Sequence, residues 1–100
     1  MPNPYERLAR CVGFEWDRGN ATKNWDKHDV SQGECEQAFF NRPLLVKHDA
    51  GHSLAESRLY ALGRTDENRF LFVAFTMRND LIRVISARNM TPAERRRYPL

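Results

Sequence analysis

The spacing of apolar residues along the chain changes from alternating to helical and back to alternating. An alternating segment over 12–16 predicts a short strand. Asp17 is a candidate N-cap, and the polar segment after it has apolar anchors at helical spacing, which predicts a helix to about His28. Ser31-Gln-Gly-Glu34 has the form of a capping box and predicts a second helix that ends before Asn41-Arg-Pro43.

The second half of the chain is predicted to be mainly strand. Short apolar or alternating runs, separated by turn-forming residues, predict strands over 44–46, 56–63, 70–76 and 81–87. Thr91-Pro-Ala-Glu94 is a second capping box, with proline at the favoured first helical position, and it opens a helix over 93–98. This order predicts an α+β fold: a mainly antiparallel β-sheet with two N-terminal helices and a short C-terminal helix.

Length and composition narrow the class of protein. The 100 residues predict a single domain over 1–100, and no apolar run approaches the roughly 20 residues of a membrane span. The N-terminal segment lacks the apolar core of a secretory signal, so we expect a cytoplasmic protein without membrane association. Cys11 and Cys35 are too few for a disulfide framework and lack metal-ligand spacing. We expect both thiols to be reduced and structural, and we expect no metal site and no cofactor.

The basic charge is concentrated in the second half. Residues 1–50 carry seven Lys/Arg and eight Asp/Glu, whereas residues 51–100 carry nine arginines, no lysine and five Asp/Glu. The planar guanidinium forms paired hydrogen bonds with phosphate or carboxylate. The arginine bias therefore has two interpretations: a phosphate-binding surface or an ordinary solvated surface.

Several separate motifs, in matching order and spacing over about residues 13–98, resemble the BrnT family of toxins. They are Phe14-Glu-Trp-Asp17, Lys23-Asn-Trp-Asp-Lys-His28, Val30-Ser31, Leu62-Gly63, the run to Thr76, Ile82-Arg-Val-Ile-Ser-Ala-Arg88 and Glu94-Arg-Arg-Arg-Tyr98. The resemblance implies a RelE-like fold and a ribonuclease that acts as the toxin of a bacterial type II toxin–antitoxin system. It also implies a BrnA-like, DNA-binding antitoxin as partner, RNA as substrate, and contact with operator DNA only through the antitoxin complex.

One position departs from the family pattern. Many family members have glutamate followed by arginine after the strand that ends at Thr76, whereas this chain has Met77-Arg78. The loss of this carboxylate keeps an alternative open: a catalytically weak or inactive homologue that acts mainly as an antitoxin-binding co-repressor.

Metal-independent RNA cleavage requires a base for the 2′-hydroxyl, cations for the phosphorane and an acid for the 5′-oxygen. Arg58 and Arg83 are the leading catalytic cations, because each interrupts an apolar strand and must reach solvent, a carboxylate or a phosphate. The alternative is a cross-strand ion pair, for example with Glu56. His52 and Glu56 are the candidate base and its orienting partner, or otherwise part of a polar loop.

Further basic residues are candidates for RNA binding. Lys23 and Lys27 share one face of the predicted helix, next to His28, or else form an ordinary exposed helix end. Arg88 lies five residues after Arg83, so the two side chains share a face only if a bulge intervenes. Arg88 is otherwise a candidate to anchor the C-terminal helix.

The C-terminal helix and the aromatic residues supply the last candidates for RNA binding, antitoxin binding or the core. Arg95, Arg96 and Arg97 point around most of a short helix, so we expect one or two to bind RNA and others to meet the antitoxin. Tyr98 has two candidate roles: stacking on an RNA base or packing on the sheet. The remaining aromatic residues are assigned to the core or to the antitoxin interface: Trp16, Trp25, Phe39, Phe40, Phe70, Phe72 and Phe75.

Overall fold

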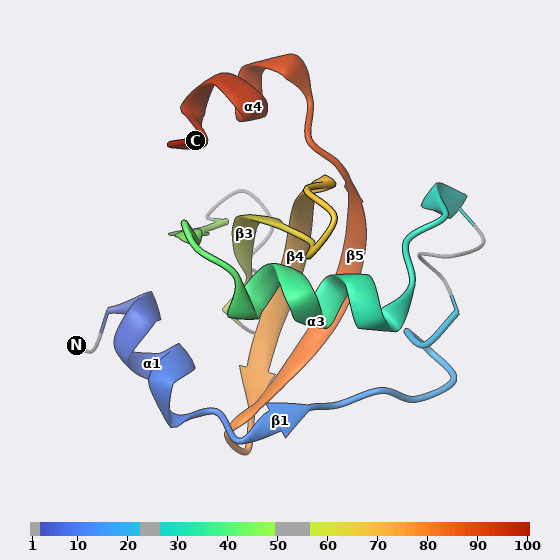
Figure 1. Ribbon diagram of the computed structural model, residues 1–100. Coiled ribbons are helices and arrows are strands. Elements are labelled where there is room, and N and C mark those ends of the chain that lie inside the picture. The colour runs from blue at the N-terminus through green and yellow to red at the C-terminus, as the bar shows by residue number, and fades with distance from the viewer. Residues whose placement is uncertain (1–2, 23–26, 50–56) are drawn as a thin grey trace.

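The computed structural model describes residues 3–22, 27–49 and 57–100, which form three helices and five strands in the described part of the chain. The order is α1 (Pro4–Arg10), β1 (Gly13–Phe14), α3 (Gln32–Phe40), β2 (Leu45–His48), β3 (Leu59–Arg64), β4 (Phe70–Arg78), β5 (Leu81–Asn89) and α4 (Pro92–Arg97). Figure 1 shows α3 lying across one face of the sheet and α4 extending past one end of it.

The strands form one mixed sheet in the order β1-β5-β4-β3-β2. β2 to β5 are consecutive antiparallel neighbours, and β1 pairs in parallel with β5. A tight turn closes the β4–β5 hairpin, with Asn79 and Asp80 at φ 51° and 59°, as a two-residue hairpin turn requires. The predicted α+β class and the mainly antiparallel sheet are therefore confirmed.

The main core lies between α3 and the sheet. The capping box predicted at Ser31 and Glu34 is present and fixes the start of α3, which buries Cys35, Ala38 and Phe39. Gly63 of β3 lies directly beneath the helix, and a Cβ atom there would approach the Ala38 carbonyl oxygen to 2.5 Å. Glycine at this position therefore allows α3 to pack closely on the sheet.

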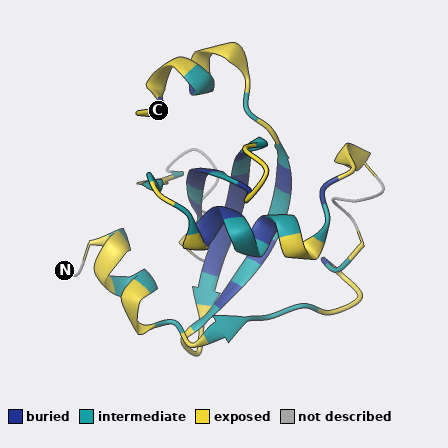
Figure 2. Cartoon of the chain, viewed as in Figure 1, coloured by how far each residue is buried: buried dark blue, intermediate teal, exposed yellow. Residues whose placement is uncertain are grey.

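Figure 2 shows buried residues concentrated in the sheet and on the inner side of α3, whereas α1 and α4 are mostly exposed. The segment after α4 nevertheless packs on the face of the sheet opposite α3. Tyr98 is buried there, and its hydroxyl donates a hydrogen bond to the Pro43 carbonyl. None of the helices in the described part of the chain combines the length and apolar composition that a bilayer span needs.

The predicted helix that starts at Asp17 is wrong over residues 18–22, which form turns. The buried Asn20 side chain accepts a hydrogen bond from the Asp17 N–H and donates to the carbonyls of Glu15 and Val84. Polar side chains that bind nearby backbone in this way compete with helix formation. Residues 27–28 are helical, and residues 23–26 lie outside the described part.

Helix α1 was not predicted. Its N-cap is Asn3, whose side chain accepts a hydrogen bond from the Glu6 N–H, and Pro4 occupies the first helical position. The remaining elements agree with their predicted ranges to within a few residues, apart from the start of the predicted 56–63 strand, since residues 50–56 lie outside the described part.

Candidate functional site

A bulge in β5 determines which arginines share a face. Ala74 of β4 pairs with Ser86, but the next residue, Phe75, pairs with Val84, so Ile85 is an extra residue in β5. Val84 and Ala87 are both buried in the core on the α3 side. The bulge that would allow Arg83 and Arg88 to share a face is therefore present. Both arginine side chains point away from α3.

We call the surface opposite α3 the arginine face; it carries Arg58, Arg83 and Arg88. Arg58 immediately precedes Leu59, which is buried in the core, so alternation directs Arg58 to the opposite side. Thr76 of β4 pairs with Arg83, and its hydroxyl donates to the Ser57 carbonyl at 2.8 Å. Arg83 of β5 and Arg58, which directly precedes β3, thus lie on either side of Thr76, about 10 Å apart at the backbone if the usual strand spacing holds.

Arg83 is held by two carboxylates. Its Nη1 lies 2.7 Å from Asp17 Oδ2 and 3.5 Å from Glu15 Oε2, and its Nη2 donates to Asp17 Oδ1 at 3.2 Å. The hydrogen bond from Arg83, aided by the Gly19 N–H, lowers the pKa of Asp17 below its ordinary value. The Asp17 side chain remains 50% exposed, so the ion pair lies at the surface within reach of a ligand.

The sequence missed Asp17 and Glu15 as partners of Arg83. It interpreted Asp17 as a helix cap within a family motif, and it named Glu56 as the example of a cross-strand counterion. β1 instead pairs in parallel with β5, Phe14 opposite Ile82, and this brings the residues that follow β1 beside Arg83. The signal in the sequence was the pair of carboxylates just after the first short strand.

Arg88 anchors the C-terminal helix, which was one of its two predicted roles. Its two terminal nitrogens bind the two Glu94 carboxylate oxygens at 2.7 and 3.0 Å, and its guanidinium lies 4.1 Å from the centre of the Phe72 ring. Burial raises the pKa of Glu94, but hydrogen bonds from Arg88 and Thr91 outweigh it and hold the pKa below its ordinary value.

The three arginine side chains of α4 point in different directions and make different contacts. Arg95 lies over the Phe70 ring, 4.0 Å from its centre, and binds the Leu100 carbonyl. Arg96 is exposed. Arg97 Nη1 donates to the Tyr60 hydroxyl at 3.3 Å, which places Arg97 at the edge of the arginine face. Tyr98 packs back onto the sheet, 5.9 Å from the Phe70 ring, the second of its two predicted roles.

Lys27 and His28 are not brought to the arginine face. Both are exposed, and Arg69 binds the His28 and Asp29 carbonyls as well as Glu34 in the first turn of α3. This holds the segment at the N-terminal end of α3. The other candidates, Lys23, His52 and Glu56, lie outside the described residues.

Met77, at the position where the family pattern has glutamate, packs against the core on the α3 side. A carboxylate at this position would point away from Arg58 and Arg83. Over the described residues, no group of three His, Cys, Asp or Glu side chains is arranged to hold a metal ion.

A family model described as "Ribonuclease toxin, BrnT, of type II toxin-antitoxin system" matches residues 16–94. The chain belongs to the BrnT family. The predicted resemblance is thereby confirmed, and membership in this family of ribonuclease toxins implies a protein antitoxin as partner. No curated protein matches the chain. The region matched to the BrnT family contains Asp17 and the three arginines of the arginine face, whereas α1 and β1 precede it.

Proposed function

We propose that this chain is an endoribonuclease that cleaves single-stranded RNA by metal-independent transesterification on the arginine face. The observation that carries the proposal is the alignment of Arg58 and Arg83 on either side of Thr76, on the face of the sheet opposite α3. In a family of ribonuclease toxins, a pair of guanidinium groups on one surface is suited to an RNA phosphate.

In the proposed reaction, the 2′-oxygen of the RNA attacks the adjacent phosphorus and the 5′-oxygen of the next nucleotide leaves. The products are a 2′,3′-cyclic phosphate and a 5′-hydroxyl end. Negative charge accumulates on the phosphorane oxygens, and Arg58 and Arg83 stabilise it through paired N–H donors. Glu56 or His52 is the proposed base that takes the 2′-hydroxyl proton, and the leaving 5′-oxygen takes up a proton from solvent. Both residues precede Arg58 in the chain and lie outside the described residues.

The carboxylates at Arg83 keep its guanidinium oriented before RNA binds. Exposed ion pairs are weak, so a phosphate can replace Asp17 as the acceptor. The exposed Arg96, with Arg88 and Arg95 at the α4 end of the sheet, extends the positive surface proposed to bind the RNA backbone.

We further propose that a BrnA-like antitoxin neutralises this activity in the cytoplasm, and that the complex reaches operator DNA through the antitoxin. The alternative, a co-repressor without catalysis, rests on Met77. The position of Met77 on the α3 side argues against it, because a glutamate there would not belong to the arginine face.

The test is incubation of purified, antitoxin-free protein with end-labelled single-stranded RNA, with and without a chelator. We expect cleavage in both conditions and products that carry a 2′,3′-cyclic phosphate. RNA binding without cleavage would favour the co-repressor. Cleavage that a chelator abolishes and added metal restores would contradict the metal-independent mechanism.

A further inference from the structure

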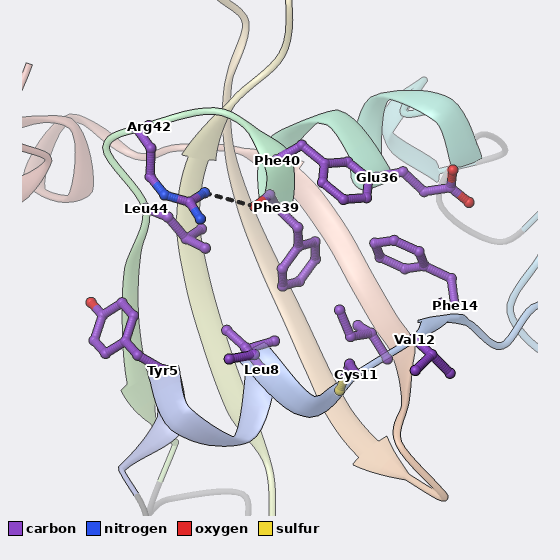
Figure 3. A pocket seen from close by; sticks show the side chains of 13 residues that line it. Tyr5, Leu8, Cys11, Val12, Phe14, Glu36, Phe39, Phe40, Arg42 and Leu44 are labelled. Carbon is purple, nitrogen blue, oxygen red and sulfur yellow. Dashed lines mark hydrogen bonds between the residues drawn. The ribbon is translucent and has the colours of Figure 1, made fainter.

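The exposed apolar surface of the described chain is concentrated in one place, away from the arginine face. Among the described residues, four large hydrophobic side chains are exposed: Tyr5 at 45%, Val12 at 83%, Phe40 at 73% and Leu100 at 60%. All but Leu100 line a single groove (Figure 3). Contiguous apolar patches of this kind mark interaction surfaces more often than scattered exposed residues do.

This N-terminal groove lies between α1, β1 and α3. Figure 3 shows Leu8 of α1, Phe14 of β1 and Phe39 of α3 pointing into it from three elements. Ile82 of β5 also lines it, and the cavity measures about 420 Å³. This volume accepts a few large apolar side chains, and the exposed Val12 and Phe40 at the margins extend the contact beyond the cavity.

The groove carries opposite charges on its lining. Within the described residues, the Arg42 guanidinium donates hydrogen bonds to the backbone carbonyls of Phe39 and Asn41. Its positive charge therefore has no carboxylate partner in that part of the chain. Glu36 accepts a hydrogen bond from the Trp16 indole N–H at 2.8 Å, a neutral donor. Figure 3 shows these two side chains at separate ends of the groove. A matching occupant has an acidic group near Arg42 and a basic group near Glu36.

The two walls of the groove differ in their relation to the family. The α3 wall lies within the region matched to the BrnT family, residues 16–94, whereas α1 and β1 precede it. Tyr5 nevertheless secures α1 to the sheet, because its hydroxyl accepts a hydrogen bond from the Val46 N–H at 2.9 Å. Helix α1, which precedes the region matched to the family, therefore completes a surface that the family region begins.

We propose that the N-terminal groove binds an amphipathic helix of this chain's own antitoxin. A groove between helices accepts the apolar stripe of a partner helix, and the type II family implies a protein partner. The opposite charges of Arg42 and Glu36 fix the direction of the helix. The inference rests on family membership and is independent of the proposed cleavage chemistry.

The test uses the purified product of the reading frame next to this chain's gene as the binding partner. Phe40→Asp and Val12→Asp place a charge in the groove at exposed positions, so the fold is retained. Leu100→Asp is the matched control, because Leu100 is also apolar and exposed but lies outside the groove. We expect each groove variant to bind at least about tenfold more weakly, as for residues central to an interface, and the control to bind as the unmodified chain does.

Groove variants that bind the neighbouring product with unchanged affinity would overturn the proposal, as would failure of the unmodified chain to bind it. So would a free chain that is dimeric and that Phe40→Asp converts to monomers without loss of partner affinity, since a second copy would then occupy the groove. RNA cleavage by the same variants separates the two proposals. We expect it to be unchanged, whereas absence of cleavage in every variant and in the unmodified chain counts against the catalytic proposal alone.

Discussion

At the scale of single residues, the carboxylates bound by arginine connect stability to pH. Asp17, Glu34 and Glu94 pair with Arg83, Arg69 and Arg88, and the pKa of each carboxyl lies below its ordinary value. A carboxyl whose pKa is lower in the folded state stabilises that state above its unfolded pKa. This contribution is lost as the pH falls through the folded pKa.

Glu94 gives the clearest prediction, because it is buried and both binds Arg88 and completes the α4 capping box. We expect Glu94→Ala to lower the free energy of unfolding by about 1–3 kcal/mol, as for loss of a cap and a charged hydrogen bond. Glu94→Gln retains a capping side chain and should cost less. Urea denaturation at pH 7 measures both.

The same variants test the pH dependence. The unmodified chain should lose stability as the pH falls from about 5 toward 3, through the carboxyl range. Glu94→Gln should lose less over that interval because it has one fewer carboxyl to protonate. An identical pH profile for the two proteins would contradict the role assigned to Glu94.

At the scale of elements, the contact between α3 and β3 depends on Gly63. A Cβ at this position would meet the Ala38 carbonyl oxygen at 2.5 Å, and this atom belongs to the helix backbone, which cannot rotate away. We expect Gly63→Ala to displace α3 and to destabilise the fold by about 1–3 kcal/mol, as overpacking does. Thermal unfolding measures the loss.

A suitable control is Gly33→Ala, since Gly33 is exposed near the start of α3 and a Cβ there meets only the Ser31 hydroxyl, at 3.9 Å. This substitution should be neutral or stabilising because alanine favours helix. Equal destabilisation by the two substitutions would show that close packing is not the reason for glycine at position 63.

Elements governed by local chemistry were predictable from the sequence. The capping boxes at Ser31 and Thr91 placed α3 and α4, and apolar alternation placed the strands. The turns over 18–22 were not predictable, because Asn20 binds the Val84 carbonyl, 64 residues away in the chain. Tertiary contacts of this kind override local helix propensity.

The arginines of the candidate site were predictable from the sequence, but their strand register and their carboxylate partners were not. The sequence identified Arg58, Arg83 and Arg88 and stated that a bulge would decide whether the last two share a face. The register of β4 and β5 supplies that bulge, which periodicity alone does not reveal. The Asp17 contact depends on the parallel pairing of β1 with β5, which no local pattern predicts.

At the scale of the whole molecule, two different surfaces lie on opposite sides of the sheet. The arginine face is suited to phosphate, and the N-terminal groove on the α3 side is suited to an apolar protein segment. The arrangement leaves the proposed RNA-binding surface and the proposed antitoxin-binding groove physically separate.

The positive charge on the arginine face and on α4 predicts that RNA binding depends on salt. If three arginines contact phosphates, the logarithm of the binding constant should fall with the logarithm of salt concentration with a slope of about −2. Arg96→Ala should reduce that slope, because Arg96 is exposed on α4. Fluorescence anisotropy with a labelled single-stranded RNA measures both, and a slope near zero would contradict phosphate binding.

The most direct test of the central claim is the rate of RNA cleavage by Arg58→Ala and Arg83→Ala variants that remain folded. Arg10→Ala is the control, because Arg10 is an exposed arginine on α1, away from the arginine face. Removal of one charge-stabilising donor typically lowers the rate about 10²–10³-fold, and we predict a loss of this size for both variants and none for the control. Cleavage by either variant at the rate of the unmodified chain would contradict the account.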